Sequence, residues 1–598
     1  GFGADLRTRA NSRSFFNMGF YAVKDRVLGP KQDAQHPNQG GSSFYVDGVH
    51  YFPNGFLAAA DINITSNLAF RQVFSDSIQL AISPEERSQV FVNKNFGAYS
   101  FNFIARTQVI SIPTARIRTR EMPSISIDRR PGLVSWLKGK LPAYFSFESS
   151  LSGVSRKETV EDQATFLAEG NQNPIITPSI VQRLDIYPRV SVPLSFDGWG
   201  VTATARVRGT FYSNSIDPLT RLVLSKDEVR GYGEFQLDVR PPALARNFHH
   251  DDGSFWFRHV VEPYMTYRRI DGVSNFDHII RFDEVDAVAD TNELEYGVAN
   301  RFFLRRSTEA VKVRPKQKPK AEGEKGKNET KGEAGAAEKA EREKKEIPKN
   351  TRVSGALTAL LTKSPLTRQP YEFLSITLRQ KYFFDPTFGG ALVPGRRNQF
   401  YPINTFSGFT YGGVPRRFSP LNVEARLRAP ATADSELFSD VRTDIDTLGE
   451  GGGLRDLAVS FGMRRHVAVL RALEAFQTFY YTRAITLAPS LRQFSDRFGK
   501  EPGTLQGSQW SPSVFIGDRN RGWYGGTSLF FDFQNRPGKG SPLISSVVTV
   551  GRAWDCCSLT AQYFTFNVGL RHENRVVFSF RLNGIGTFGT EQIGQRFR

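Results

Sequence analysis

The two cysteines of the chain are neighbours in sequence. Cys556 and Cys557 lie in the stretch WDCCSLTAQYF, and the chain contains no other cysteine. Free surface thiols are uncommon in oxidising compartments, where cysteines usually form disulfides. An isolated adjacent pair in such a compartment therefore needs partners elsewhere, or a strained bond between neighbours. We predict that Cys556 and Cys557 are candidate disulfide residues.

Three other stretches contain residue types that bind metals or phosphates, but each lacks essential parts. They are HHDD at 249–252, GEGGGLRD at 449–456 and GIGTFG at 584–589. The first has no second cluster to complete a metal site, and the second lacks the Lys and Ser/Thr of a phosphate-binding loop. The third has too little chain after it for a dinucleotide-binding unit. No nucleophile motif is present. We therefore expect no catalytic residue, metal or cofactor, and no enzyme activity.

The elements that position these stretches are predicted from short alternations of apolar and polar residues. They recur along the whole chain between turn residues, which is typical of half-buried strands. They are clearest at 201–208, 234–240, 374–381, 423–428, 564–571 and 576–583. In each, one face is apolar and the other carries polar or charged residues. The last two flank the stretch RHENR, residues 571–575, which we predict to be a turn before a last strand at about 575–584.

The composition favours strands as well. The chain of 598 residues has 50 Phe, 19 Tyr and 6 Trp, although its hydrophobic fraction is only 39%. Aromatic side chains fit a pleated surface better than a helix. No run of about 18 apolar residues is present, so we expect no membrane-spanning helix.

Two all-β architectures fit this pattern. Soluble sandwiches would require several domains with visible linkers, and only one linker-like segment is present. A transmembrane barrel reverses the faces, so that apolar residues contact lipid and charged residues line a wet lumen. At about 10 residues per strand plus turns, the chain suffices for roughly 20 to 26 strands. We predict an all-β fold, a large transmembrane antiparallel β-barrel.

The exception is 312–349, which holds 13 Lys and Arg, 8 Glu and no aromatic residue. Such a segment buries too little to offset its ordering entropy, so we predict a disordered insertion. It divides the barrel into an N-terminal part, 1–311, and a C-terminal part, 350–598. Of the net charge of +18, the insertion contributes 13 − 8 = +5. Without a nucleic-acid-binding motif, the remaining basic residues indicate anionic lipids or phosphorylated glycolipids as partners.

Several segments resemble one family. They are YFPNGFLAAADINITSNLAFRQVFSD at 51–76, HVVEPYMTYRRI at 259–270, DEVDAVADTNELEYGVANRFF at 283–303, LSITLRQKYFFD at 374–385 and the C-terminal DCCSLTAQYFTFNVGLRHENRVVFSFRLNGIGTFG. Together they are similar to the LptD (OstA) family of lipopolysaccharide-assembly proteins, also called organic-solvent-tolerance proteins. The resemblance implies the outer membrane of a Gram-negative bacterium and transfer of lipopolysaccharide from the periplasm to the outer leaflet.

The resemblance also implies partners and a gate. Members have an LptE-type lipoprotein plug, a periplasmic jelly roll that joins the Lpt bridge, and cysteines near that jelly roll that bond the adjacent pair. The chain lacks that jelly roll and the first strands, so we expect it to be N-terminally truncated. The insertion would hang into the periplasm. Lipopolysaccharide would leave through a seam between the first and last strands, where the predicted gate residues are Val576, Phe578, Phe580, Arg581, Leu582 and Gly584.

Two other classes of protein share parts of the pattern. A porin or plugged uptake channel would have the same composition and alternation, but should lack the adjacent cysteines and the 259–303 pattern. A secreted β-rich adhesin or enzyme would dissolve without detergent. The gate interpretation has an alternative too, because the same residues would serve an ordinary closed barrel.

Overall fold

The structure is a computed structural model of the whole chain. It describes residues 1–11, 13–24, 40–74, 85–111, 115–134, 141–160, 173–251, 253, 255–304, 371–389, 417–429, 435–447, 453–466, 472–486, 504–533, 541–568, 571–582 and 586–589. The predicted insertion at 312–349 and Gly584 lie outside the described residues.

Strands make up nearly all of the described chain. The first half contains β1 (Phe2–Arg9), β2 (Phe15–Val23), β3 (Gly41–Tyr51), β4 (Phe56–Thr65), β5 (Glu85–Phe96), β6 (Tyr99–Ser111), β7 (Ala115–Leu133), β8 (Tyr144–Val160), β9 (Val181–Phe196), β10 (Trp199–Tyr212), β11 (Ser215–Ile216), β12 (Val223–Leu224), β13 (Glu228–Arg240), β14 (Leu244–His249), β15 (Phe255–Asp271) and β16 (Thr291–Leu304). The second half contains β17 (Tyr371–Phe383), β18 (Leu421–Arg428), β19 (Ser435–Asp446), β20 (Gly453–Arg465), β21 (Leu473–Thr486), β22 (Thr504–Gly517), β23 (Gly522–Asp532), β24 (Leu543–Ala553), β25 (Cys557–Val568), β26 (Arg571–Leu582) and β27 (Gly586–Gly589).

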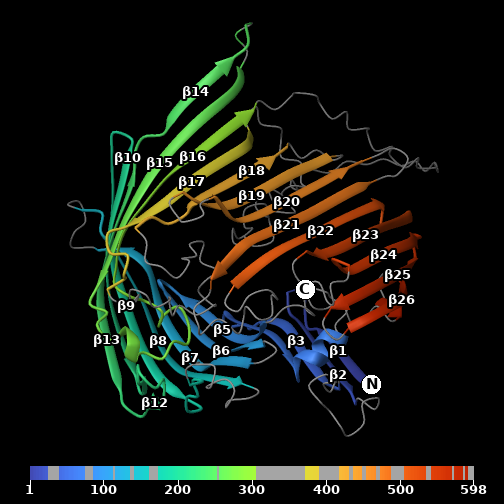
Figure 1. Ribbon diagram of the computed structural model, residues 1–598, viewed down its shortest axis with the longest axis horizontal. Helices are drawn as coiled ribbons and strands as arrows, with labels where there is room; N and C mark the ends of the chain where they lie inside the picture. The colour runs from blue at the N-terminus through green and yellow to red at the C-terminus, as the bar shows by residue number, and fades with distance from the viewer. Residues whose placement is uncertain are drawn as a thin grey trace, which may run out of the picture.

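These strands form one antiparallel sheet of 25 strands, and β11 and β12 form a separate pair. Strands that are consecutive along the chain pair with each other, except that β13 and β14 both pair with β15. Pro241 and Pro242 separate β13 from β14 because proline cannot donate to the ladder. In Figure 1 the sheet curves so that its first and last strands come to the same side of the molecule. The predicted large antiparallel barrel is confirmed.

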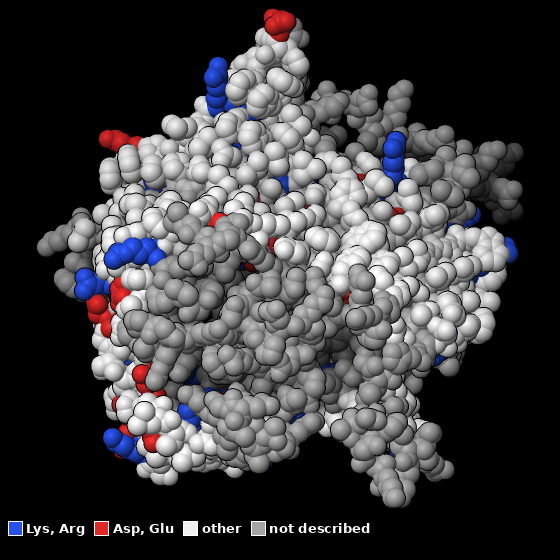
Figure 2. Space-filling model, in the orientation of Figure 1, with Lys and Arg blue, Asp and Glu red and all other residues white. Residues whose placement is uncertain are grey.

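On most of the strands with the clearest alternation in the sequence, the apolar face points outward, as predicted. On β13, Val229 is 66% and Phe235 43% exposed, whereas the alternating Arg230 and Glu234 are 1% and 5% exposed. Such reversal is the arrangement expected in lipid, where the charged face must line a lumen. On the face that Figure 2 shows, most described residues are uncharged, and the most prominent Lys, Arg, Asp and Glu lie toward the margins.

The C-terminal strands differ from the sequence prediction in two respects. Residues 571–575 are not a turn but the first residues of β26, which pair with β25. The alternation at 564–571 also has the opposite facing, because Phe564 and Phe566 pack on Val577 in an inward cluster and are at most 9% exposed. Leu559 and Tyr563 face outward there instead. The apolar residues of β25 change face along the strand, since Ser558, Thr560 and Gln562 precede Phe564 and Phe566 on the inner face, so alternation in its second half could not identify that face.

The two ends of the barrel differ in their connections. At one end, the short-turn end, strands are joined by brief turns such as 52–55, 97–98, 197–198 and 554–556. At the other, the long-loop end, connections include 161–180, 213–227 and 272–290. Outer-membrane barrels have short periplasmic turns and longer extracellular loops, which identifies the short-turn end as periplasmic. In Figure 1 the β14–β15 hairpin projects from the short-turn end, at the top, and β12 lies at the opposite end.

Helices are few and short in the described residues. The α-helix α1 (Leu68–Phe74) contacts β3 and β4, and the 3-10 turn η2 (Phe276–His278) lies in the loop after β15. Within the residues that the structure describes, no helix has the length and apolar character needed to cross a membrane.

Candidate functional site in the lumen and at the seam

The inner wall of β9, β10, β13 and β15–β17 is charged and internally paired. It borders a cavity of about 480 Å³. Glu234 accepts hydrogen bonds from Arg206 Nη1 at 2.5 Å and from Arg268 Nε at 2.9 Å. Farther along the wall, Lys381 Nζ lies 2.9 Å from Glu293 Oε1. Both signs of charge therefore line this side of the lumen, which keeps it hydrated.

The inner wall of β19–β26 is less charged. A second cavity of about 520 Å³ lies against it, and its lining includes two glycines and eight hydroxyl side chains. Arg464 Nε donates to Glu474 Oε1 at 2.8 Å, and Arg581 lies on the same wall. The lumen thus has a densely charged half and a more neutral half that ends at the last long strand.

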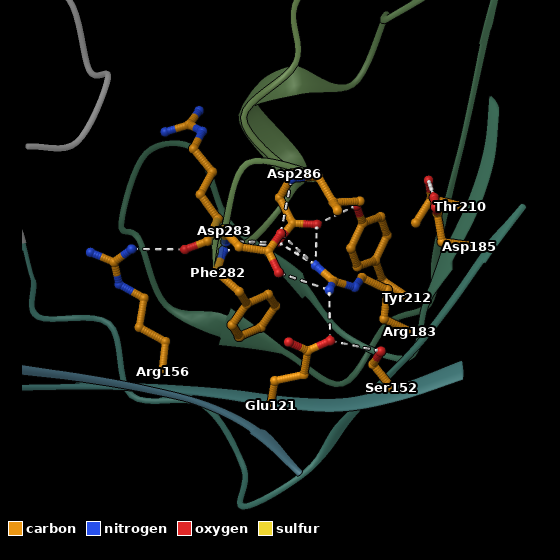
Figure 3. A network of polar contacts seen from close by, with 12 residues as sticks. Glu121, Ser152, Arg156, Arg183, Asp185, Thr210, Tyr212, Phe282, Asp283 and Asp286 are labelled. Atoms are coloured by element: carbon orange, nitrogen blue, oxygen red, sulfur yellow. Dashed lines mark hydrogen bonds and ion pairs between the residues drawn. The ribbon is translucent and has the colours of Figure 1, made fainter. Parts of the chain in front are cut away.

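A loop from the long-loop end folds into the charged half. This inner loop, residues 272–290, connects β15 to β16 and contacts inward side chains of β6, β8–β10 and β13 (Figure 3). Arg183 of β9 reaches both of its carboxylates. Nη1 and Nη2 donate to Asp283 at 2.9 Å each, and Nη1 lies 3.0 Å from both carboxylate oxygens of Asp286. The Tyr212 hydroxyl donates to Asp286 at 2.7 Å.

Two further arginines bind the backbone of the inner loop. Arg230 donates to the carbonyl oxygens of Val285 and Asp286 at 2.7 and 3.0 Å. Arg156 Nη1 donates to the carbonyl of Arg281 at 2.7 Å. Arg156, Arg183 and Arg230 are each at most 2% exposed. Removing one partner from such a buried network costs about 3–5 kcal/mol because a charge is left without its counterpart.

An apolar cluster holds the inner loop from its other side. Ile280 and Phe282 pack with Val154, Val181, Ile175 and Ile216, which come from β8, β9, the segment before β9 and β11. Several long connections therefore share one small core inside the barrel mouth. The inner loop is fixed by both polar and apolar contacts.

The two carboxyls of the inner loop are not equivalent. Burial opposes ionisation of Asp283, but the guanidinium of Arg183 outweighs it and lowers the pKa of that carboxyl. Asp286 is completely buried, and this burial raises its pKa against the opposing effect of Arg183. The bidentate contact with Asp283 is therefore the main charged anchor of the inner loop.

The sequence prediction missed this network. Arg183 and Asp286 are about 100 residues apart, and spacing along the chain gives no sign of their contact. A signal did exist, because Asp283 and Asp286 follow the apolar run Ile279, Ile280 and Phe282 in a connection too acidic to be buried without cations.

The seam lies between β1 and the C-terminal strands. β26 pairs with β25 over twelve residue pairs but with β27 over only four, from Ser579 to Leu582. In the part of the chain that the structure describes, no pairing joins β1 to β26 or β27. β1 and β26 both run toward the short-turn end, whereas β27 runs away from it. The last strand opposite in direction to β1 is therefore β27.

This direction corrects the predicted last strand. The strand at about 575–584 corresponds to the end of β26, and the glycine-rich stretch after it, expected to loosen pairing, forms β27 instead. Val576, Phe578 and Phe580 face outward, at 57%, 61% and 39% exposure. Leu582 lies on the same face and Arg581 on the opposite, inward face, with Ser579. The predicted facing of these residues thus agrees with the structure.

The adjacent cysteines lie at the short-turn end, between β24 and β25. Cys556 is exposed and Cys557 half-buried, and both are free. Their Sγ atoms are 2.6 Å apart, longer than the roughly 2.05 Å of a disulfide bond. Both are accessible from the periplasmic end. The strand ends that flank the predicted insertion, Leu304 and Tyr371, belong to the same end.

The remaining sequence motifs form no metal site in the part of the chain that the structure describes. His249 ends β14, and His250 and Asp251 follow it at the tip of the projecting hairpin. Among the described residues, no group of three or more His, Cys, Asp or Glu could hold a metal ion. The stretch at 449–456 is described only from Gly453, where β20 begins.

Comparison with known proteins gives one informative match. The family model of LptD, LPS transport system D, matches residues 39–344, which are 306 of the 598 residues. No curated protein matches the chain.

Solved structures with some likeness are outer-membrane receptors. The alcaligin receptor FauA from Bordetella pertussis has 8% identity and a TM-score of 0.24, with 95% of this chain and 77% of that chain covered. The siderophore receptor PirA from Acinetobacter baumannii has 6% identity and a TM-score of 0.30, with 96% and 74% covered. At these scores they add nothing to the fold already described.

The family model covers more than half of the chain, and the barrel built from it has a polar lumen, outward apolar faces and a thinly paired seam. The chain belongs to the LptD family, the lipopolysaccharide-transport proteins of the Gram-negative outer membrane.

Proposed function

We propose that the barrel releases lipopolysaccharide sideways, through the seam between β1 and the β26–β27 end of the sheet. The phosphorylated head requires a hydrated path, and the charged inner wall around Glu234 offers one. The acyl chains require apolar surroundings, which the membrane supplies once the seam parts. The head would pass through the lumen while the chains slide between the strand edges.

The observation that supports this proposal is the thin pairing at this edge: in the described residues no pairing joins β1 to β26 or β27, and β27 itself is short. Four residue pairs hold β27 to β26, against twelve between β25 and β26. Each ladder bond broken in lipid is costly because no water replaces it, so a seam that opens should have few. The outward Val576, Phe578, Phe580 and Leu582 would contact the passing acyl chains, and inward Arg581 the head. Gly584 would contribute backbone freedom between β26 and β27.

The proposal includes partners. A lipoprotein plug of the LptE type would occupy the lumen, since a barrel of this size encloses a hole wide enough to leak. A jelly-roll segment outside this chain would deliver lipopolysaccharide from the periplasmic Lpt bridge. The inner loop would have to leave its place on Arg183 for a large head to pass.

A photoreactive phenylalanine analogue tests the seam without new cysteines. Placed at Phe588 of β27, it should crosslink to β1 on illumination and stop newly made lipopolysaccharide from reaching the cell surface. The matched control is Phe211 of β10, a strand that pairs with both β9 and β13 along its length. Crosslinking there should leave export unchanged. Normal export after a mapped β27–β1 crosslink would exclude the lateral route and favour a channel.

A further inference from the structure

A row of cations lies on the outer wall of the barrel near the long-loop end. Arg116, Arg118 and Arg120 alternate along β7, and Lys157 of β8 stands directly opposite Arg118 in the ladder. Their facing follows from the inner wall: Glu121, the next residue, points into the lumen and lies 2.5 Å from Arg106 and 3.8 Å from Arg183. Residues 116, 118 and 120 therefore point outward. We call these four residues the outer basic row.

The outer basic row is only partly neutralised. Arg118 and Lys157 are like charges directly opposite each other, an arrangement that destabilises a sheet. Glu86 of β5 shares this face and attracts Arg116, but it lies 2.9 Å from Arg71 of α1. Within the described residues, no ion pair or aromatic ring is recorded for the four members of the row.

Outward cations at the short-turn end of the barrel have aromatic neighbours. Each of three has an aromatic ring for a neighbour. Lys94 lies 4.5 Å from the centre of the Phe56 ring, Arg129 5.3 Å from that of Phe145, and Arg552 5.2 Å from that of Trp554. These positions belong to an interfacial aromatic girdle. The outer basic row, by contrast, presents its charge without such a neighbour.

The position of the row along the strand matches a headgroup layer. Between Arg129 and Arg120, β7 shows outward Ile127 and Ile125, which are 43% and 40% exposed. Because of a register shift between Glu121 and Ser124, Arg129 and Arg120 face β8 residues that are eight positions apart, Phe147 and Ser155. Eight residues span about 26 Å along a strand, or about 20 Å across the membrane at the usual tilt. The apolar band of such barrels is about 25 Å tall, so Arg120 and Arg118 stand at its outer edge and Arg116 stands beyond it.

We propose that the outer basic row binds the phosphate groups of lipopolysaccharide that already resides in the outer leaflet. Guanidinium groups hold phosphate oxygens in paired hydrogen bonds, and the outer leaflet is where the long-loop end meets this lipid. Hydroxyls of Ser155 and Thr159, opposite Arg120 and Arg116, lie on the same face. The site is separate from the seam: it would hold a lipid at the barrel wall rather than pass one through.

Equilibrium binding of lipid A, the phosphorylated anchor of lipopolysaccharide, tests the site. The full chain is placed in phosphatidylcholine nanodiscs with bisphosphorylated or dephosphorylated lipid A, and bound lipid is counted by native mass spectrometry. The R116Q/R118Q/R120Q variant should bind bisphosphorylated lipid A between about tenfold and 100-fold more weakly than the unaltered protein. The matched control K94Q/R129Q/R552Q removes three outward cations at the other end and should bind within about twofold.

Further arms make the result decisive. Heat-modifiable gel mobility verifies that each variant is folded. If the glutamine variant does not fold, the R116K/R118K/R120K variant still tests the site because it retains the charge. The lysine variant should bind within a few-fold of the unaltered protein. Equal binding by the glutamine variant, equal binding of dephosphorylated lipid A, or a lysine variant as weak as the glutamine one would overturn the proposal. Because no lipid is exported in this assay, its failure would leave the seam proposal standing.

Discussion

Arg183 connects the wall of the barrel to the inner loop through both of its carboxylates. Replacing it by glutamine leaves Asp283 and Asp286 without their main cation. We expect R183Q to weaken docking of the loop by about 3–5 kcal/mol. The amides of residues 279–290 should then exchange hydrogen faster in the folded protein, and cells should become more sensitive to vancomycin, which crosses an intact outer membrane poorly.

The matched control is R189Q, on the same strand. Arg189 pairs with Glu148, and both side chains are substantially exposed, so this pair contributes little. A second variant, R183Q/D283N, removes the main charged carboxylate together with the cation and should recover part of the lost protection, because less buried charge is left unpaired. If R183Q and R189Q gave the same exchange rates, the network would not hold the loop.

Single residues were the hardest features to predict from the sequence. The outward facing of Val576, Phe578 and Phe580 followed from alternation because Arg581 marked the other face. The contacts of Arg183 could not be found in this way, since they depend on how one loop folds back over five strands. Local patterns carry the facing of a side chain but not its distant partner.

At the scale of the strand, the inside-out arrangement gives a direct test. Ala205 is exposed on the outer face of β10 between Phe235 and Val190, both of which face lipid. An arginine there would place its charge in hydrocarbon. We expect A205R to destabilise the barrel by about 2–4 kcal/mol in urea unfolding in lipid vesicles.

The control for A205R is T202R on the opposite face of the same strand. Thr202 pairs in register with Asp238 on the inner wall, so the new charge would meet water and a carboxylate. We expect T202R to change the unfolding free energy by less than about 1 kcal/mol. Equal destabilisation by the two variants would mean that the outer face does not contact lipid.

Strands that keep their polar residues on one face were predicted correctly, and β25, whose apolar residues change face along the strand, was not. β13 has Arg230 and Glu234 on one side, so its inner face was evident. β25 has Leu559 and Tyr563 on one face and Phe564 and Phe566 on the other, and its inner face was assigned wrongly. Alternation predicts the inner face of a strand only where one face is clearly more polar than the other.

At the scale of the molecule, the adjacent cysteines give a test of assembly. A disulfide from Cys556 or Cys557 to a third cysteine requires a segment or partner outside the 598 residues. If such bonds form in cells, reducing agent should change the gel mobility of the full-length protein, and C556S/C557S should abolish that change. Migration that does not differ between the unaltered and substituted proteins would show that neither thiol is bonded.

The presence of β27 determines whether the last strand of the sheet can pair with β1 in an antiparallel ladder. In an antiparallel sheet the first and last strands run in opposite directions only when the number of strands along the sheet is even. β26 runs parallel to β1, and the following β27, which is only four residues long, restores the opposite direction. Without it, the facing edges would offer amides and carbonyls spaced for the slanted bonds of a parallel ladder. Removing Gly586–Gly589 should therefore impair closure far more than its few hydrogen bonds suggest.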